Sequence, residues 1–403
     1  MKSIKELYRI GTGPSSSHTM GPRKAAEIFL ERHPEATAFK VTLYGSLAAT
    51  GKGHMTNIAI TEVLQPVAPV EIIWEPKIFL PFHPNGMKFV SVDKEGKETD
   101  QWVVFSIGGG ALAEESDGAS SVNTPDVYSM NSMTEILQWC ERTGKSYWEY
   151  VKECEDSDIW DYLQEVWKTM QNAVKRGLEQ EGVLPGPLNL RRKASTYYIR
   201  ASGYKQSLQS RGLVFAYALA VSEENASGGV IVTAPTCGSC GVMPAVLYHL
   251  AKSREFSDTR ILRALATAGL VGNIVKTNAS ISGAEVGCQG EVGVACAMAS
   301  AAANQLFGGS PAQIEYAAEI ALEHHLGMTC DPVYGYVQIP CIERNAIGAE
   351  RALDSANYAL LTDGTHFISL DQVIQTMKET GIDMMDKYKE TAKGGLAKHF
   401  FSC

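Results

Sequence analysis

Short runs rich in Val, Ile, Phe and Trp recur through the first third of the chain, bounded by Gly, Pro and Asp. Runs of this kind are typical of β-strands, and they predict strands at residues 38–44, 70–74, 88–92 and 102–107. Apolar residues spaced three and four positions apart predict helices at residues 23–32 and 55–64. The first third of the chain is therefore expected to form a mixed α/β domain.

The pattern changes after a polar stretch rich in small residues, 114–125, which resembles an interdomain linker. Beyond it, apolar residues at helical spacing predict helices at residues 134–153, 158–180, 207–221, 242–251, 259–271 and 312–326. An alanine-rich stretch at 292–306 predicts a further helix, packed tightly inside the domain. We therefore expect an α+β fold, with an α/β domain at residues 1–125 and an all-helical domain at residues 126–403.

Composition narrows the class of protein. Of the 403 residues, 45% are hydrophobic and 20% are charged, which is normal for a packed soluble protein. No stretch reaches the roughly 18 continuous apolar residues that a membrane span requires, and residues 1–10 lack the apolar core of a secretory signal. The net charge of −9, without a basic cluster, disfavours nucleic acid as a partner. The sequence predicts a cytoplasmic protein with no membrane or nucleic-acid partner.

The sequence contains nine cysteines, most of them in its second half. In a long chain without a secretory signal, such thiols indicate metal binding or catalysis rather than a disulfide framework. Cys237 and Cys240 form a C-x-x-C within segment 233–241, TAPTCGSCG. No second C-x-x-C accompanies it, so a zinc ribbon is disfavoured. Both redox sensitivity and plain packing stay open for this pair.

Three further cysteines lie where the local backbone is unusual. Cys288 belongs to a glycine-rich break, 280–291, inside an otherwise helical region, and a proline stands close to Cys330 and to Cys341. Thiolates are the preferred ligands of iron–sulfur clusters. The alternative is a set of buried, inert cysteines that pack as small hydrophobes. The residues alone leave these two interpretations evenly matched.

Two histidines precede predicted helices in the first domain. His18 lies in segment 11–22, GTGPSSSHTMGP, where glycines and hydroxyls ahead of a helix supply N–H and O–H donors for an anion. His54 ends the run GKGH at 51–54, at a strand-to-helix edge of the kind where α/β sites gather. A histidine can move protons near neutral pH. The alternatives are a solvated helix cap at 11–22 and a structural role for His54.

With these motifs the sequence resembles the iron–sulfur-dependent L-serine dehydratases, the L-serine ammonia-lyases that work without pyridoxal phosphate. The run SSSHTMGP at 15–22 resembles the signature of the family's N-terminal β domain. The runs TAPT at 233–236 and EVGCQGEVG at 285–293, with the segments around Cys330 and Cys341, resemble its catalytic α domain. The resemblance covers almost the whole chain.

The resemblance implies a 4Fe–4S cluster held by Cys288, Cys330 and Cys341, with one iron open to substrate. In the family the C-terminal cysteine folds back onto that iron, and Cys403 holds this position here. It also implies a Lewis-acid role for the iron, removal of the α-proton by a neutral histidine, and pyruvate and ammonium as products. A homodimer, oxygen sensitivity and a place in amino-acid catabolism and gluconeogenesis are further family expectations.

We assign His54 as the general base and His18 as its partner in holding substrate and relaying a proton; the sequence does not rank the two histidines. The candidate substrate-binding residues all carry hydroxyl groups in the resembling motifs: Ser16, Ser17, Thr19 and Thr236. Two departures from the family bear on this assignment. Family members commonly carry Asn and Ala where this chain has Cys237, Ser239 and Cys240, and the region 85–125 is shorter than in the longer members.

The same residues leave three alternatives open: one concerns the substrate, and two concern proteins that are not enzymes. One is β-elimination on L-cysteine or L-threonine. Another is a non-enzymatic thiol redox or metal sensor built on Cys237 and Cys240. A third is an inactive paralogue that only binds an amino acid. L-serine dehydration is the interpretation that uses both histidines together with all three cluster cysteines.

Overall fold

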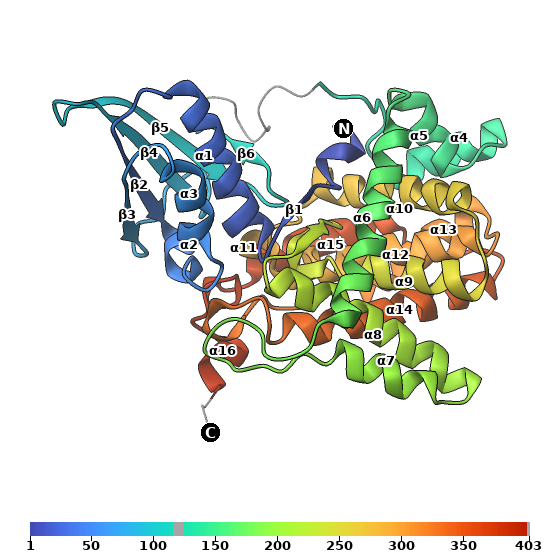
Figure 1. The fold of residues 1–403 in the computed structure, drawn as a ribbon. Helices are drawn as coiled ribbons and strands as arrows, with labels where there is room; N and C mark the ends of the chain where they lie inside the picture. Colours follow the sequence, from blue (N-terminus) through green and yellow to red (C-terminus); the bar gives the residue numbers. More distant parts are fainter. Residues whose placement is uncertain (116–124, 401–403) are drawn as a thin grey trace.

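The computed structural model describes residues 1–115 and 125–400, and it has an α/β region followed by a mostly helical region (Figure 1). The predicted α+β fold is confirmed. The predicted linker at 114–125 lies almost entirely outside the described residues, and so does Cys403.

A five-stranded mixed sheet forms the α/β region, in the order β3-β2-β4-β5-β6. β2 (Ala38–Tyr44) pairs in parallel with β3 (Val70–Glu75) and antiparallel with β4 (Gly86–Val92). β5 (Glu98–Ser106) and β6 (Leu112–Ala113) continue the sheet antiparallel. All four predicted strands are present, and β5 begins earlier than predicted.

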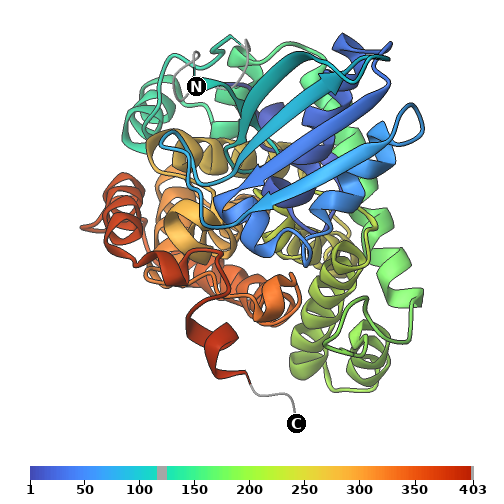
Figure 2. The same cartoon turned by 90° about the vertical axis from the view of Figure 1, so that its left-hand side faces the viewer.

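Helices α1 (Gly21–Arg32) and α3 (Thr56–Leu64) pack behind the sheet as it is seen in Figure 2, and the short α2 (Gly45–Thr50) directly follows β2. Alternate residues of β2 are buried, as expected for a strand with one face on a core. Phe29 of α1 stacks nearly parallel to Trp102 of β5. Burial of each such side chain contributes about 1.5–3 kcal/mol, and this packing holds α1 against the sheet.

Residues 1–12 pack on the helical region, away from the sheet. Ile4, Leu7 and Tyr8 are fully buried within the helical core. β1 (Ile10–Thr12) pairs antiparallel with β7 (Val230–Val232), so the region after residue 126 is not purely helical. The sequence did not predict this pair, because three-residue strands are too short to show a period. The pairing anchors the chain on the helical region just before segment 13–20.

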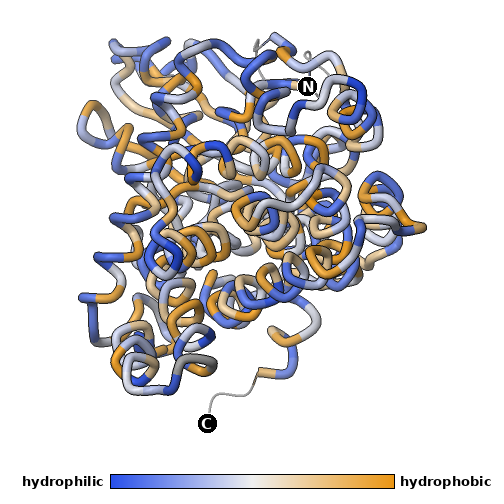
Figure 3. Tube along the Cα trace, turned by 90° about the vertical axis from the view of Figure 1, so that its right-hand side faces the viewer, coloured by the Kyte–Doolittle hydropathy of each residue, from blue (hydrophilic) through white to orange (hydrophobic). Residues whose placement is uncertain are grey.

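The helical region is built around α12 (Val292–Leu306), in which every residue except Gln305 is buried. Its alanines allow α10 (Asp258–Asn278), α13 (Pro311–Glu323) and α14 (Cys341–Leu360) to pack closely against it. Figure 3, which views the molecule from the side of the helical region, shows hydrophobic and hydrophilic positions interleaved along the helices there. The remaining helices are α4 (Met133–Thr143), α5 (Tyr147–Cys154), α6 (Ile159–Glu179), α7 (Ala194–Ser202), α8 (Gln206–Ala226), α9 (Val242–Ser253), α11 (Gly283–Val286), α15 (Leu370–Asp383) and α16 (Gly395–His399).

The helix predicted at 134–153 is wrong as a single element, because the structure divides it into α4 and α5. Gly144 ends α4 in a left-handed conformation with φ 68°. Ser146 and Glu149 then form a capping box that starts α5. Among the described helices, none has the length and apolarity that crossing a membrane would require.

Candidate active site

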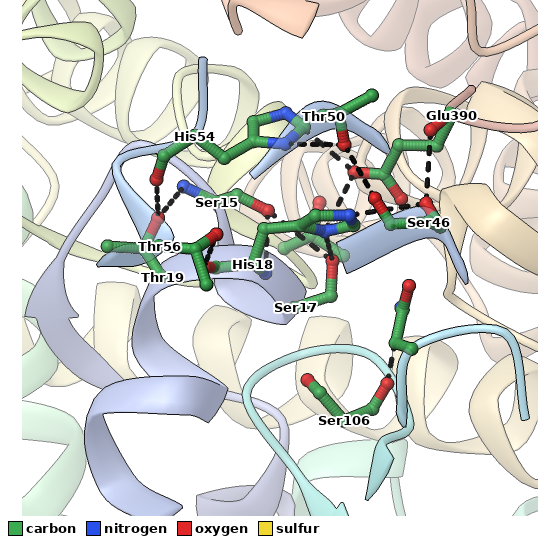
Figure 4. A network of polar contacts seen from close by, with 12 residues as sticks. Ser15, Ser17, His18, Thr19, Ser46, Thr50, His54, Thr56, Ser106 and Glu390 are labelled. Atoms are coloured by element: carbon green, nitrogen blue, oxygen red, sulfur yellow. Dashed lines mark hydrogen bonds and ion pairs between the residues drawn. The ribbon is translucent and has the colours of Figure 1, made fainter. Parts of the chain in front are cut away.

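The polar segment that precedes α1 forms one turn of π-helix, η2 (Ser16–Met20). Ser15 caps this turn by accepting a hydrogen bond from the His18 backbone N–H at 3.1 Å. The His18 side chain is fully buried, with Nδ1 2.9 Å from Ser17 Oγ and Nε2 3.2 Å from Ser46 Oγ (Figure 4). Because Ser46 belongs to α2, His18 links the starts of two helices.

His54 is buried between α2 and α3, with its Nδ1 3.1 Å from Thr50 Oγ1. Its Nε2 has no hydrogen-bond partner among the described residues. Thr19 Oγ1 donates to the His54 carbonyl at 2.7 Å, and the ring centroids of His18 and His54 lie 4.5 Å apart. The structure thus brings the two predicted histidines side by side (Figure 4).

The hydrogen-bond partners assign the protons on both imidazole rings. Thr50 Oγ1 donates to the Ser46 carbonyl, so it accepts from His54 Nδ1–H. Ser46 Oγ donates to the Glu390 carbonyl, so it accepts from His18 Nε2–H. His18 Nδ1 is then occupied by the Ser17 hydroxyl, whereas His54 Nε2 keeps a free lone pair. Of the two histidines, His54 is the one with an available basic nitrogen.

Glu390 completes this group, and the sequence analysis missed it. Its carboxylate Oε1 lies 3.5 Å from His18 Nδ1 and 4.0 Å from His54 Nε2, and its Oε2 has no partner among the described residues. The Glu390 backbone is fixed beside Cys330, because Glu390 N–H donates to the Cys330 carbonyl at 2.8 Å. No local motif marks Glu390, since its histidine partners lie more than 300 positions away along the chain and Cys330 lies 60 positions away.

Burial sets the charge state of this cluster. It lowers the pKa of His18 to about 3 and lowers the pKa of His54 well below its ordinary value. Burial also raises the pKa of Glu390, and the nearby Glu291 and Cys288 raise it further. Both histidines are therefore uncharged at neutral pH, which is the form that a general base requires.

The structure also brings the three predicted cluster cysteines together. Cys288 lies in the 3-10 turn η5 (Gly287–Gly290), Cys341 opens α14, and all three side chains are buried. The Cys330 thiol hydrogen-bonds with Cys288, and Cys341 interacts electrostatically with Cys288. Arg344, on the first turn of α14, interacts with all three cysteines and donates to the Thr329 carbonyl at 2.6 Å.

The donor set fits an iron–sulfur cluster, because thiolates are the ligands that such clusters prefer. A hydrogen bond with Cys288, together with burial, raises the pKa of Cys330. Burial and the electrostatic effect of the nearby Cys288 thiol raise the pKa of Cys341. Bound metal would supply the positive charge that thiolates here require. Among the described residues, only His18, His54 and Glu390 place three possible metal-ligand atoms all within 4.8 Å of one another. At least one pair of the three cysteine sulfurs therefore lies more than 4.8 Å apart.

Glycine allows the chain to pass close to these thiols. Gly287 has a positive φ of 72°, and a Cβ there would lie 2.7 Å from the Met328 carbonyl oxygen. A Cβ on Gly283 would lie 3.1 Å from Cys330 Sγ and 2.6 Å from Glu291 Oε1. Glycine at 283 is therefore required by the close approach of backbone to Cys330, and glycine at 287 by its positive φ and its approach to the Met328 carbonyl.

Thr236 lies next to Glu291, whose Oε2 accepts a hydrogen bond from Thr236 Oγ1 at 3.1 Å. Burial raises the pKa of Glu291 to about 7. Cys237 Sγ lies 3.3 Å from Met20 Sδ, and both thiols of the C-x-x-C are buried. Burial raises the pKa of both thiols, which disfavours the reactive thiolate and favours plain packing for this pair.

A second set of buried polar groups faces the same region and was missed from the sequence. His83 Nε2 lies 3.5 Å from Glu285 Oε1, and Asn85 Nδ2 donates to the Ser106 carbonyl at 3.3 Å. Four atoms of this set have no hydrogen-bond partner among the described residues: His83 Nε2, Asn85 Oδ1, Ser106 Oγ and Ser282 Oγ. Buried polar atoms without partners indicate a place for water or a ligand. The run HPN at 83–85, directly before a strand, was the available signal.

The predicted hydroxyl residues are engaged in different ways. Thr19 Oγ1 accepts from Ser15 N–H and donates to the His54 carbonyl, so the structure uses it to join two segments. Ser17 Oγ bonds to His18, and the Ser16 carbonyl accepts from Gly21 N–H. Ser16, Ser17 and Thr19 therefore lie beside the histidines, whereas Thr236 lies on the cysteine side.

Comparison with known proteins matches the chain in two parts. The family model described as "Serine dehydratase beta chain" matches residues 3–73, and the one described as "Serine dehydratase alpha chain" matches residues 88–397. An L-serine dehydratase of Streptomyces coelicolor is 42% identical over 100% of this chain and 99% of its own length. TdcG of Escherichia coli, also an L-serine dehydratase, is 42% identical, covering 98% of this chain and 99% of its own.

A Helicobacter pylori L-serine dehydratase is 36% identical over 98% of each chain. The alignment with the Streptomyces protein runs over 453 positions, more than the 403 residues of this chain. This excess agrees with a chain that is shorter than its relatives.

Proposed function

Because the chain belongs to the serine dehydratase family, we propose that it is an L-serine ammonia-lyase, which converts L-serine to pyruvate and ammonium. The mechanism that we propose depends on one observation: the histidine site and the three thiols both lie next to Glu390. Glu390 has His54, with its free Nε2, on one side and the three buried thiols on the other.

We propose that Cys288, Cys330 and Cys341 hold a 4Fe–4S cluster. When bound, such a cluster with one iron open supplies a Lewis acid for the serine hydroxyl that leaves. The proposal extends to Cys403, as the residue that covers this iron when no substrate is present. No lysine is needed to form a Schiff base in this scheme, so we propose a reaction without pyridoxal phosphate.

The chain's own residues then account for the proton chemistry. His54 Nε2 accepts the α-proton of serine, since Thr50 holds the ring with the proton on Nδ1. His18, bonded through both ring nitrogens to Ser17 and Ser46, orients the site rather than acting as the base. Loss of the proton and of the hydroxyl leaves aminoacrylate, which tautomerises and hydrolyses to pyruvate and ammonium.

The buried base gives an expected pH dependence. The pKa of His54 is lowered by burial, so the neutral base persists as the pH falls through about 6.5, the ordinary value for histidine. In Glu390→Gln, where ionisation of Glu390 no longer contributes, kcat/KM for pyruvate formation should therefore stay level between about pH 8 and 6.5 and fall only at lower pH. A fall centred at or above pH 6.5 in that variant, with unchanged cluster absorbance, would contradict a desolvated His54.

Substrate choice is tested by anaerobic reconstitution of the full chain with iron and sulfide, followed by assays on three amino acids. We expect L-serine to give pyruvate with a kcat/KM at least about tenfold above that for L-cysteine or L-threonine. Against L-threonine, the expected basis is a site without room for an extra methyl group, a difference worth about 1–3 kcal/mol. Against L-cysteine, the expected basis is a site that positions a hydroxyl rather than a thiol. Preference for L-cysteine or L-threonine would replace the substrate assignment, and absence of any product would favour a sensor.

We further propose the organisation in which this reaction occurs. The proposed domains are residues 1–125 and 126–403, and we propose that the first closes over the second. Strand β1 belongs to the first domain by residue number but packs on the helical region. We also propose that the protein forms a homodimer. We place it in a reducing cytoplasm, because oxygen damages a cluster that has an open iron.

A further inference from the structure

The substrate of the proposed reaction is a zwitterion, and its ammonium group requires an acceptor. Both histidines are neutral, and His18 has no free nitrogen. Four carboxylates lie in or next to this region: Glu291 and Glu390 interact with the thiols, Asp331 pairs with Arg344, and Glu285 faces His83. The ammonium acceptor is therefore sought among these four.

Three of these carboxylates are already engaged. Asp331 Oδ2 accepts from Leu396 N–H at 2.6 Å, and its Oδ1 accepts from the Thr329 hydroxyl at 3.1 Å. Glu291 accepts from Thr236 Oγ1 and from the Gly283 backbone. Glu285 accepts from the Ser280 hydroxyl and is 41% exposed. None of the three offers a buried oxygen that lacks a partner.

Glu390 differs from the others in this respect. It is only 5% exposed, its Oε2 has no hydrogen-bond partner among the described residues, and no arginine or lysine pairs with it there. A buried carboxylate without a cationic partner is costly. An ammonium group placed against it would supply the missing charge and the missing donors.

The position of Glu390 suits a group on the α-carbon of serine. Its Oε1 lies 4.0 Å from His54 Nε2, the nitrogen that takes the α-proton in the proposed reaction. The α-proton and the ammonium nitrogen are bonded to the same carbon, so their acceptors must lie near each other. Figure 4 shows the Glu390 side chain directed toward the two histidine rings.

The backbone holds this carboxylate in a fixed place. Glu390 N–H donates to the Cys330 carbonyl, and Cys330 N–H donates to the Tyr388 carbonyl, both at 2.8 Å. On the other side, the Glu390 carbonyl accepts from Ser46 Oγ at 3.1 Å. Glu390 is thereby positioned relative to a cluster cysteine and to α2 at the same time.

We propose that Glu390 binds the α-ammonium group of the substrate and thereby selects α-amino acids over acids that lack the amino group. This inference rests on the proposed function. Glu390 is then a specificity residue that orients the α-carbon toward His54 Nε2.

The test compares L-serine with 3-hydroxypropionate, which is serine without its amino group, on anaerobically reconstituted holoenzyme. Calorimetric Kd values, KM and kcat are measured for native protein, Glu390→Gln and Glu390→Asp. We expect Glu390→Gln to weaken L-serine binding about 10- to 100-fold, the loss of one charge-assisted hydrogen bond. Binding of 3-hydroxypropionate should change less than about threefold, and Glu390→Asp should recover part of the L-serine affinity.

Glu319→Gln is the matched control, because Glu319 is a buried carboxylate on α13, outside the proposed site. Equal weakening of both ligands by Glu390→Gln would indicate a structural role and overturn the inference. Unchanged affinities with a lower kcat would assign Glu390 to proton transfer and also overturn it. Because binding is measured directly, native protein that binds L-serine without forming pyruvate would refute the proposed function separately.

Discussion

Replacing Cys288, Cys330 or Cys341 with alanine, one at a time, is expected to give a folded chain that holds no stable cluster and forms no detectable pyruvate. Each of these thiols would bind a different iron, so no remaining side chain can take its place. The loss of activity in each variant should exceed the decrease of about 10- to 100-fold that follows removal of a residue that only orients a metal ligand. Iron and sulfide content, visible absorbance and pyruvate formation are the measurements.

Cys140→Ala provides the matched control for these variants. Cys140 is equally buried, but it lies on α4, away from the cluster cysteines. This variant should keep its iron, its colour and its activity, with a modest loss of stability of about 1 kcal/mol. Native iron content in any one of the three cluster variants would remove that cysteine from the ligand set.

Replacing His54 with glutamine is expected to separate catalysis from cluster binding. Glutamine keeps a polar side chain between α2 and α3 but offers no basic nitrogen in place of Nε2. Iron content and absorbance should match the native protein, while kcat falls about 10²- to 10⁴-fold, the usual contribution of a general base. Single-turnover pyruvate formation and iron analysis on the same sample provide the comparison.

His249→Gln is the corresponding control. His249 is a buried histidine on α9 that bonds to Ser210 Oγ at 2.8 Å, away from the cysteines and the sheet. Its replacement should leave kcat within about twofold of native. If His54→Gln retained native turnover while His18→Gln lost it, the roles that we give the two histidines would have to be exchanged.

Much of the fold could be predicted because its elements have clear local signals. The strands at 38–44 and 70–74 are compact runs of β-forming residues, and the alanine-rich stretch at 292–306 coincides with the central helix α12. The break at Gly144 was missed because apolar spacing continues across it. The β1–β7 pair was missed because its partners are about two hundred residues apart and each is only three residues long.

The candidate site shows the same limit. His18 and His54 could be singled out because glycines and hydroxyls surround them in sequence, and the cysteines because their segments are distinctive. Glu390 and Ser106 have no such surroundings, and only tertiary packing brings them to the site. The choice between the histidines likewise depended on the donors and acceptors around each ring, which no sequence pattern specifies.

The most direct test of this account is Mössbauer spectroscopy of the full chain, reconstituted anaerobically with isotopically enriched iron and measured with and without L-serine. If three thiolates hold a cubane and leave one iron for substrate, the signal of one iron in four should change when L-serine is added, while the other three stay as they were. A spectrum that contains only mononuclear iron, or a cluster whose four irons are all indifferent to L-serine, would contradict it.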